Sequence, residues 1–532
     1  MERAEPLPTR RPLRSELHHH VHLATVALAL IALPWSEFLL SLAQILMLAN
    51  WIWEGIALHD LRGRSERAVS RPGSAVFLSF FALYLLGLAW TTDLKWGLDL
   101  CRILLPVPVF GLVLASLPRL QPTEWRKLLL LGAWSTTAST VACFALRHEV
   151  LALGNYRDLS PFISHIRLSL MLCMAIAAFV HFRPQRLLIH AAQWVAIGWC
   201  LWFLYLLSTL IAPLVLAALA LFLAWRTARR RPLPVRAAIG AVLGLAALAA
   251  TLFIFDSIQR HYHADPGELD RLDRSSAGGE VYYHDLRNPQ LENGHYVWIN
   301  VADKELERTW DRRSKLSFTG KDKLGQPLRA TLIRYLASMG QRKDSIGVRA
   351  LAEGDVRRIE QGITSVAEGR QGALQARIDQ VLYEFEIYRK GGDPSGHSVT
   401  MRLEFVRTGL GIAKAHWPFG VGTGDTQLAF NEAYQRNGSP LDARWRLRAH
   451  NEYLTLLISF GLPGFLWCLF SWWWPAWRNR ACAQPLFTAW AIIFLLSCFS
   501  EDTLETQMGA TFFALYYTLF TFAAPPDSDS TA

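Results

Sequence analysis

Long apolar runs separated by short polar connections make up most of this 532-residue chain. Each run is roughly 18 to 22 residues long, the length that a helix needs to cross about 30 Å of hydrocarbon. Soluble cores rarely contain such runs. We therefore predict an all-α polytopic membrane protein with about twelve transmembrane helices, over residues 21–36, 38–56, 73–90, 98–117, 126–146, 162–181, 187–206, 209–225, 237–256, 451–472, 485–500 and 506–524.

One large polar insertion separates the ninth predicted span from the tenth. We predict an N-terminal bundle of about nine helices over residues 1–256, an insertion over 257–449, and about three helices over 450–532. The insertion begins irregularly, and then apolar positions recur at helical spacing, for example over residues 328–336, 356–363 and 376–388. Two roles stay open for this mainly helical part: a rigid cap on the membrane helices, or direct contact with substrate.

Basic residues gather in every second connection between the apolar runs. Short cytoplasmic loops collect Lys and Arg, so we expect these loops and both termini in the cytoplasm and the insertion in the periplasm of a bacterial inner membrane. The net charge of +10 is therefore explained first by membrane topology and only second by a partner such as nucleic acid. The basic loops carry Arg62, Arg64, Arg67 and Arg71, then Arg119, Arg126 and Lys127, then Arg183 and Arg186, then Arg226, Arg229, Arg230, Arg231 and Arg236, and finally Arg478 and Arg480.

Composition agrees with a membrane part joined to a soluble part. The chain is 52% hydrophobic and 18% charged, too apolar for an ordinary soluble enzyme and too polar to be membrane throughout. All seven cysteines lie in or beside apolar segments, so the insertion is expected to hold together by packing, without disulfides or zinc. No acidic cluster with metal-ligand spacing stands out in the outer part, and we expect neither a metal nor a cofactor.

Three segments at the predicted outer face contain residues that can carry chemistry. In the first, residues 160–169, His165 and Arg167 stand in the opening turns of an apolar helix. An ionisable side chain at that depth usually faces a cavity or a partner. The alternative is that Arg167 extends to the membrane interface.

The second segment places Arg402 and Glu404 at the start of a helix that leads into a glycine-rich turn over residues 416–424. Backbone amides in such a turn can approach an anionic group. The strand and the lysine of a phosphate-binding loop are missing, so a structural turn is the favoured interpretation.

The third segment, residues 444–454, clusters arginines around His450 directly before an apolar helix. Guanidinium groups such as that of Arg448 suit a diphosphate because they stay charged and donate two hydrogen bonds to phosphate oxygens. Positive neighbours favour the neutral form of His450, which can act as a base. A capping or interface role is the plainer alternative for this histidine.

Together these segments resemble the O-antigen ligase and polymerase family, membrane glycosyltransferases that use polyprenyl-diphosphate donors. The run His450-Asn451-Glu452-Tyr453-Leu454 with Gly461-Leu462-Pro463-Gly464 is similar to the family's most specific signature. Arg402 followed by residues 418–424 resembles a second element, and Ser164-His165-Ile166-Arg167-Leu168-Ser169 a third. Residues 501–507 also resemble the family. One departure is that residues 207–213 lack an arginine found in many members, so Arg157 or Arg407 is a candidate to replace it.

The resemblance implies transfer of a glycan from undecaprenyl diphosphate to lipid A-core, with inversion and without a metal. His450, Arg402 and Arg167 are then the expected catalytic residues. The expected substrate-binding residues are Arg448, His165, Arg157, Glu404 and Asn451. His450 is either the base for the acceptor hydroxyl or a ligand of a phosphate oxygen, and Glu404 or Glu452 can orient it or form a surface ion pair.

Other functions stay open at this point. A polysaccharide polymerase and a protein O-oligosaccharyltransferase share the donor chemistry and differ in the acceptor. A transporter or lipid flippase also fits the number of predicted helices, but such proteins usually show internal repeats and polar broken helices at the midplane. Here no repeat is apparent, and the polar residues gather at the outer face.

Overall fold

The computed structural model describes residues 13–525 except 154–155, 210, 230, 263–267, 287, 289, 367–377, 379–380, 383, 387 and 390. The described part is mostly helical, as predicted, and its one sheet is a pair of two-residue strands. The chain forms two compact units, which we describe separately. Unit 1 contains Met1–Arg230 and Met401–Ala532, and unit 2 contains Arg231–Thr400. Residues 401–449, which the pattern analysis assigned to the insertion, therefore pack with unit 1.

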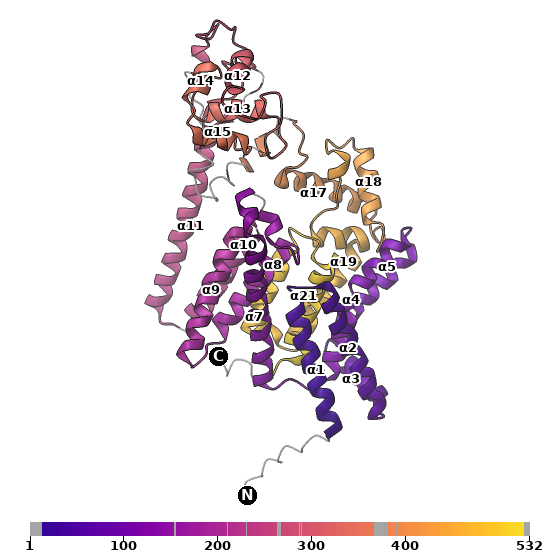
Figure 1. The fold of residues 1–532 in the computed structure, drawn as a ribbon. Helices are drawn as coiled ribbons and strands as arrows, with labels where there is room; N and C mark the ends of the chain where they lie inside the picture. Colours follow the sequence, from indigo (N-terminus) through magenta and orange to yellow (C-terminus); the bar gives the residue numbers. More distant parts are fainter. Residues whose placement is uncertain are drawn as a thin grey trace. The chain divides into compact units, whose positions relative to one another are not determined.

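Unit 1 is a bundle of helices that follows the predicted apolar runs closely (Figure 1). The break expected near residue 208 is present, since Ser208 adopts a left-handed conformation at the end of α9. The helices are α1 (Leu13–Ala32), α2 (Glu37–Ala57), α3 (Leu61–Ser70), α4 (Ser74–Gly87), α5 (Leu94–Ile103), α6 (Pro106–Ser116), α7 (Pro122–Arg147), α8 (His165–His181), α9 (Leu187–Leu207), α10 (Ile211–Arg229), α17 (Ser398–Ala415, beginning in unit 2), α18 (Thr426–Arg436), α19 (Glu452–Arg478), α20 (Pro485–Ser497) and α21 (Gln507–Thr518).

In the described residues, six helices are long and apolar enough to cross a membrane, or seven if the bent pair α3 and α4 counts as one span. The predicted number of twelve is therefore not confirmed. Two predicted spans fall short for different reasons: α20 has only 13 residues, and α1 begins with polar residues, including four histidines within five positions. Six such helices nevertheless identify the chain as a membrane protein.

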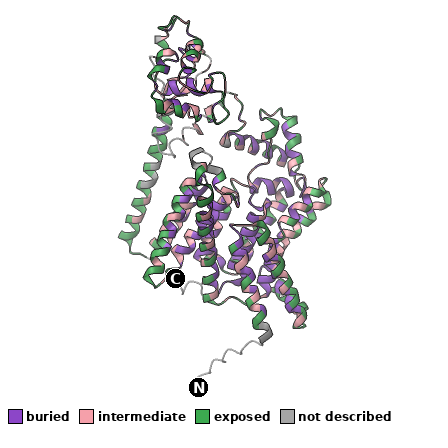
Figure 2. Cartoon of the chain, viewed as in Figure 1, coloured by how far each residue is buried: buried purple, intermediate pink, exposed green. Residues whose placement is uncertain are grey.

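The core of unit 1 lies where α4, α6, α19 and α21 face one another. Aromatic rings fill it, with Phe77 stacked on Tyr517 at 4.6 Å and Phe494 against Phe513 at 4.7 Å between ring centroids. Figure 2 shows buried residues on the facing sides of these helices and exposed residues on the outer sides. This packing fixes the frame on which α19 presents its first turn.

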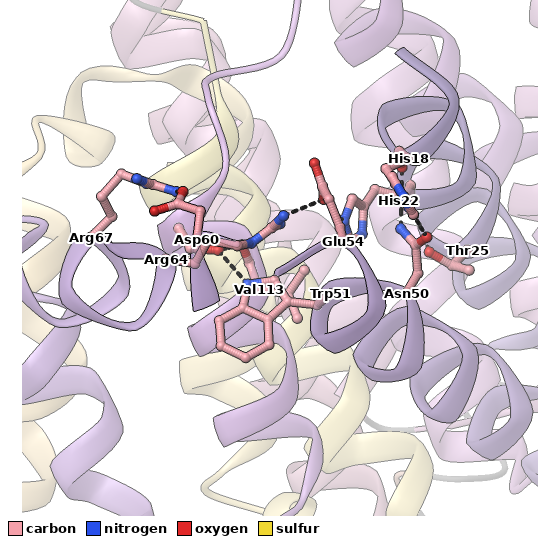
Figure 3. A network of polar contacts seen from close by, with 11 residues as sticks. His18, His22, Thr25, Asn50, Trp51, Glu54, Asp60, Arg64, Arg67 and Val113 are labelled. Atoms are coloured by element: carbon pink, nitrogen blue, oxygen red, sulfur yellow. Dashed lines mark hydrogen bonds and ion pairs between the residues drawn. The ribbon is translucent and has the colours of Figure 1, made fainter. Parts of the chain in front are cut away.

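A buried ionic cluster joins the start of α1 to the end of α2 and to α3 (Figure 3). Glu54 accepts from His22 at 3.0 Å and from Arg64 at 2.5 Å. The Arg64 guanidinium lies 5.7 Å from the ring centroid of Trp51, and His18 bonds Asn50 at 2.8 Å. Because buried charges are costly unless paired, this cluster ties the three helices together at one defined register.

Unit 2 contains α11 (Leu233–Tyr262), the strands β1 (Leu291–Glu292) and β2 (His295–Tyr296), and the helices α12 (Asp303–Trp310), α13 (Leu328–Ser338), α14 (Ser345–Ala350) and α15 (Glu353–Glu360). Its apolar core is built around Trp310 and Tyr335. The helix predicted over 328–336 is confirmed by α13. The one over 356–363 overlaps α15, and the one over 376–388 lies largely outside the described residues.

Candidate functional site

The first turn of α19 holds His450 in an unusual backbone conformation. Asn451 is the N-cap of α19, and its side chain accepts the Leu454 N–H at 3.0 Å. His450, one residue earlier, has a left-handed φ of 46°. A left-handed non-glycine residue costs about 1 to 3 kcal/mol and persists only where the surroundings enforce it. The imidazole is 36% exposed and packs against the Phe405 ring of α17 at 5.8 Å.

A carboxylate behind His450 is fixed by two other donors. Asp502 Oδ1 accepts the Asn451 N–H at 3.1 Å and the Thr455 hydroxyl at 2.9 Å. Its second oxygen, Oδ2, lies 4.0 Å from His450 Nδ1. This separation is too long for a hydrogen bond. Asp502 therefore lies on the Nδ1 side of the imidazole without being hydrogen-bonded to it.

Three further bonds attach the start of α19 to the segment between α20 and α21. Fully buried Glu452 accepts the Leu504 N–H at 2.9 Å through Oε2, and its own N–H donates to Cys498 at 2.8 Å. The Asn451 amide donates to the Phe499 carbonyl at 3.2 Å. Glu452 therefore holds this neighbouring segment, and its complete burial excludes the surface ion pair that was one of its two predicted roles.

That segment supplies three carboxylates, Glu501, Asp502 and Glu505, which we call the acidic strip. Each lies against a cation of the candidate site. Glu501 is 3.7 Å from Arg402, Asp502 faces His450, and Glu505 pairs with Arg448. These positions lie in residues 501–507, which resemble the family in sequence. No role could be predicted for them, because their partners are about 50 or more residues away in the sequence.

Arg167 joins the same group from α8. Its charge acts on Glu501 together with the charges of Arg402 and His450. Arg167 Nε is buried and has no hydrogen-bond partner in the part of the chain that the structure describes. Burial raises the pKa of Glu501, while these three cations oppose the rise. The three predicted catalytic residues thus all act electrostatically on one partly buried carboxylate, which Arg402 contacts at 3.7 Å.

The other predicted residues are more dispersed. Arg448 pairs with Glu505 and lies 5.3 Å from the ring centroid of Trp96, so its charge is already balanced. Buried Glu404 lies 3.9 Å from Arg407, whose side chain is 82% exposed. His165 is the first residue of α8. The side chain of Arg157 lies outside the described residues.

The glycine-rich turn uses its backbone amides within the protein. The N–H groups of Val421 and Gly422 donate to carbonyls of α19 at 2.9 Å, and that of Thr423 donates to Gly87 at 3.3 Å. These bonds leave no free row of amides for a phosphate at those three positions. The turn instead packs into a bend of α19 at Gly461, where φ is 62° and ψ is −171°.

An apolar groove opens beside the site, between α17 and α19. It has a volume of about 330 Å³. It begins at Asn451, next to His450, and continues along apolar side chains of both helices. Its lining residues are Val406, Leu410, Asn451, Tyr453, Leu454, Leu457, Phe465 and Phe499. The groove can therefore hold a hydrocarbon chain whose polar end lies near the cations.

One stretch of the chain, residues 348–469, matches a family model described as O-antigen ligase. The match includes Arg402, the glycine-rich turn, His450 and the bend of α19. No curated protein gives a significant match to the chain. Residues 348–469 are therefore similar to the O-antigen ligase family, which supports a membrane enzyme of the ligase or polymerase kind.

Proposed function

We propose that this protein transfers a glycan from undecaprenyl diphosphate to lipid A-core at the periplasmic face of a bacterial inner membrane. The observation that carries the proposal is that the charges of Arg167, Arg402 and His450 act on one partly buried carboxylate, Glu501, beside an apolar groove. Two guanidinium groups suit a diphosphate, and the groove suits the prenyl chain attached to it. In this arrangement both termini are cytoplasmic and the insertion is periplasmic.

The proposed reaction is a single displacement with inversion at the anomeric carbon. The acceptor hydroxyl oxygen bonds to that carbon as the bond from carbon to the diphosphate oxygen breaks. His450 takes the hydroxyl proton on Nε2, and Asp502 lies on the Nδ1 side of the imidazole. Arg167 and Arg402 stabilise the charge that builds on the leaving diphosphate, so these residues can promote departure without a metal.

The function is tested with purified donor, lipid A-core and full-length protein, with EDTA present. Glycan-linked lipid A-core is the expected product. Longer donor-linked chains without that product would indicate a polymerase instead. Absence of any transfer to lipid A-core, to growing glycan or to protein acceptors would contradict the proposed function.

Arg402→Lys should lower turnover about ten-fold or more, although the charge is kept. Lysine is a point charge and loses the planar, two-point recognition of phosphate that arginine provides. The measurement is the initial rate of transfer at saturating donor. Arg436→Lys is the control, because Arg436 lies on α18 and is 69% exposed. Wild-type turnover in the Arg402 variant would remove this residue from the site.

Leu410→Trp should raise the KM for an undecaprenyl donor about ten-fold with little change in kcat. The larger ring fills part of the groove and displaces a few buried methylene groups, each worth about 0.8 kcal/mol. A donor with a short prenyl chain should be much less affected. Leu428→Trp on α18 is the control, since Leu428 is also exposed, at 40%, and does not line the groove. Equal effects of both substitutions on both donors would argue against the groove as the prenyl site.

A further inference from the structure

The acidic strip balances the cations of the site while no donor is present. Isolated buried cations are strongly unfavourable, and so is a cluster of like charges. In this structure three basic residues of the site each face a carboxylate from the same short segment: Arg402 faces Glu501, His450 faces Asp502 and Arg448 faces Glu505. A donor diphosphate that binds Arg402 therefore brings its negative charge close to the carboxylate of Glu501.

The three carboxylates differ in how firmly they are held. Asp502 accepts two hydrogen bonds, from Asn451 and Thr455. Glu505 is 4% exposed in a close pair with Arg448. Glu501 instead has a long contact of 3.7 Å with Arg402, and its side chain is 15% exposed. Glu501 is therefore the carboxylate that can leave at the lowest cost.

The groups around Glu501 are those that a diphosphate would need. Arg402 on α17 lies 3.7 Å from Glu501, the charges of Arg167 on α8 and of His450 also act on this carboxylate, and Asp502 adds a repelling negative charge. Arg167 Nε lacks a hydrogen-bond acceptor in the described residues, although it is buried. A diphosphate has more oxygens than one carboxylate. In the place of Glu501 it could accept a hydrogen bond from Arg167 Nε and also bind Arg402.

We propose that Glu501 is a surrogate anion: it holds the place of the donor diphosphate between Arg167 and Arg402 in the empty site and gives way when the donor binds. The inference rests on the proposed function, because it takes the diphosphate as the ligand. Glu501 keeps the two guanidinium groups together and partly neutralised before binding. Glu501 also competes with the donor. The protein therefore binds diphosphate more weakly than Arg167 and Arg402 would bind it without Glu501.

The test is the Kd of undecaprenyl diphosphate for full-length protein in lipid nanodiscs at pH 8. Glu501→Gln should bind about ten-fold more tightly than wild type, because one competing charge within about 4 Å of the site is removed. Glu501→Asp keeps the competing charge and should show at most a small part of this gain. Glu432→Gln is the control for net charge, since Glu432 is on α18 and 70% exposed; it should stay within about two-fold of wild type.

Acidification supplies a second measurement on the wild type. Burial raises the pKa of Glu501, so this carboxylate gains its proton at a higher pH than an exposed one and then ceases to compete. Binding by wild type should therefore tighten as the pH is lowered from 8 toward the range in which Glu501 is protonated. The advantage of Glu501→Gln over wild type should shrink at the same time, because the wild-type carboxylate is then neutral as well.

The outcomes separate this inference from the proposed function. Tight binding by all variants with no gain in Glu501→Gln, or weaker binding in it, would overturn the surrogate-anion inference and leave the diphosphate site in place. Wild-type affinity that does not tighten at any lower pH at which the protein stays folded would also overturn it. If neither wild type nor any variant binds undecaprenyl diphosphate, the proposed function fails and the inference fails with it. Glu501→Ala is a second variant in case the glutamine variant does not fold.

Discussion

Replacing His450 by alanine should reduce glycan transfer by about three orders of magnitude, with the Kd of the donor changed much less. Loss of a positioned general base typically costs about 10² to 10⁴ in rate. The same substitution should leave folding nearly unchanged, since the imidazole is 36% exposed. The measurement is single-turnover transfer to lipid A-core, with donor binding measured separately on the same preparation.

The comparison that gives this result its meaning is His416→Ala. His416 follows α17 and is exposed, so its removal should leave transfer within about two-fold of wild type. Asp502→Asn should fall between the two, because it keeps the shape of the side chain and loses the charge that supports a protonated imidazole. If His450→Ala weakens donor binding as much as it slows transfer, the histidine is a phosphate ligand and the base must be sought elsewhere.

The second large effect that we expect is a loss of stability when Gly461 is replaced. A Cβ atom at this position would lie 1.6 Å from the Pro418 carbonyl oxygen, and the backbone angles are accessible essentially to glycine alone. Gly461→Ala should therefore destabilise the protein by more than about 3 kcal/mol. Thermal unfolding of the full chain in detergent measures this, together with the folded yield.

Gly411 provides a matched substitution within unit 1. It lies in α17, and a Cβ atom there would have no neighbour within 4 Å. Gly411→Ala should be neutral or stabilising by up to about 1 kcal/mol, since alanine favours a helix. Similar melting temperatures for the two alanine variants would show that the bend at Gly461 does not depend on glycine.

The helices were the most predictable part of the fold, because a membrane requires long apolar runs and these are visible in the sequence. Arg402 and His450 could be chosen because arginines and a histidine beside an apolar helix are chemically conspicuous. Their carboxylate partners could not be predicted from the sequence, because the contact between Glu501 and Arg402 depends on how α17 packs near the segment before α21. The pair between Arg448 and Glu505 shows the same limit, because it arises only in three dimensions.

The predicted domain limits illustrate a second limit. Residues 401–449 are polar in sequence, like the insertion before them, yet they pack with the membrane helices of unit 1. Phe430 and Tyr434 of α18 are fully buried in one cluster with Ile458 of α19. Polarity averaged over a segment does not reveal which neighbour covers its few apolar positions. The tertiary contacts decide that, and they place α17 and α18 beside the candidate site.

The ionic cluster around Glu54 bears on the lipid that surrounds the protein. Helix α2 begins at the exposed residue Glu37, and near its other end Glu54 is bound to His22 and Arg64. Glu54 cannot move along the helix axis without separating these buried charges. The cluster therefore fixes one end of α2, so that a bilayer of different thickness has to be accommodated at the other end.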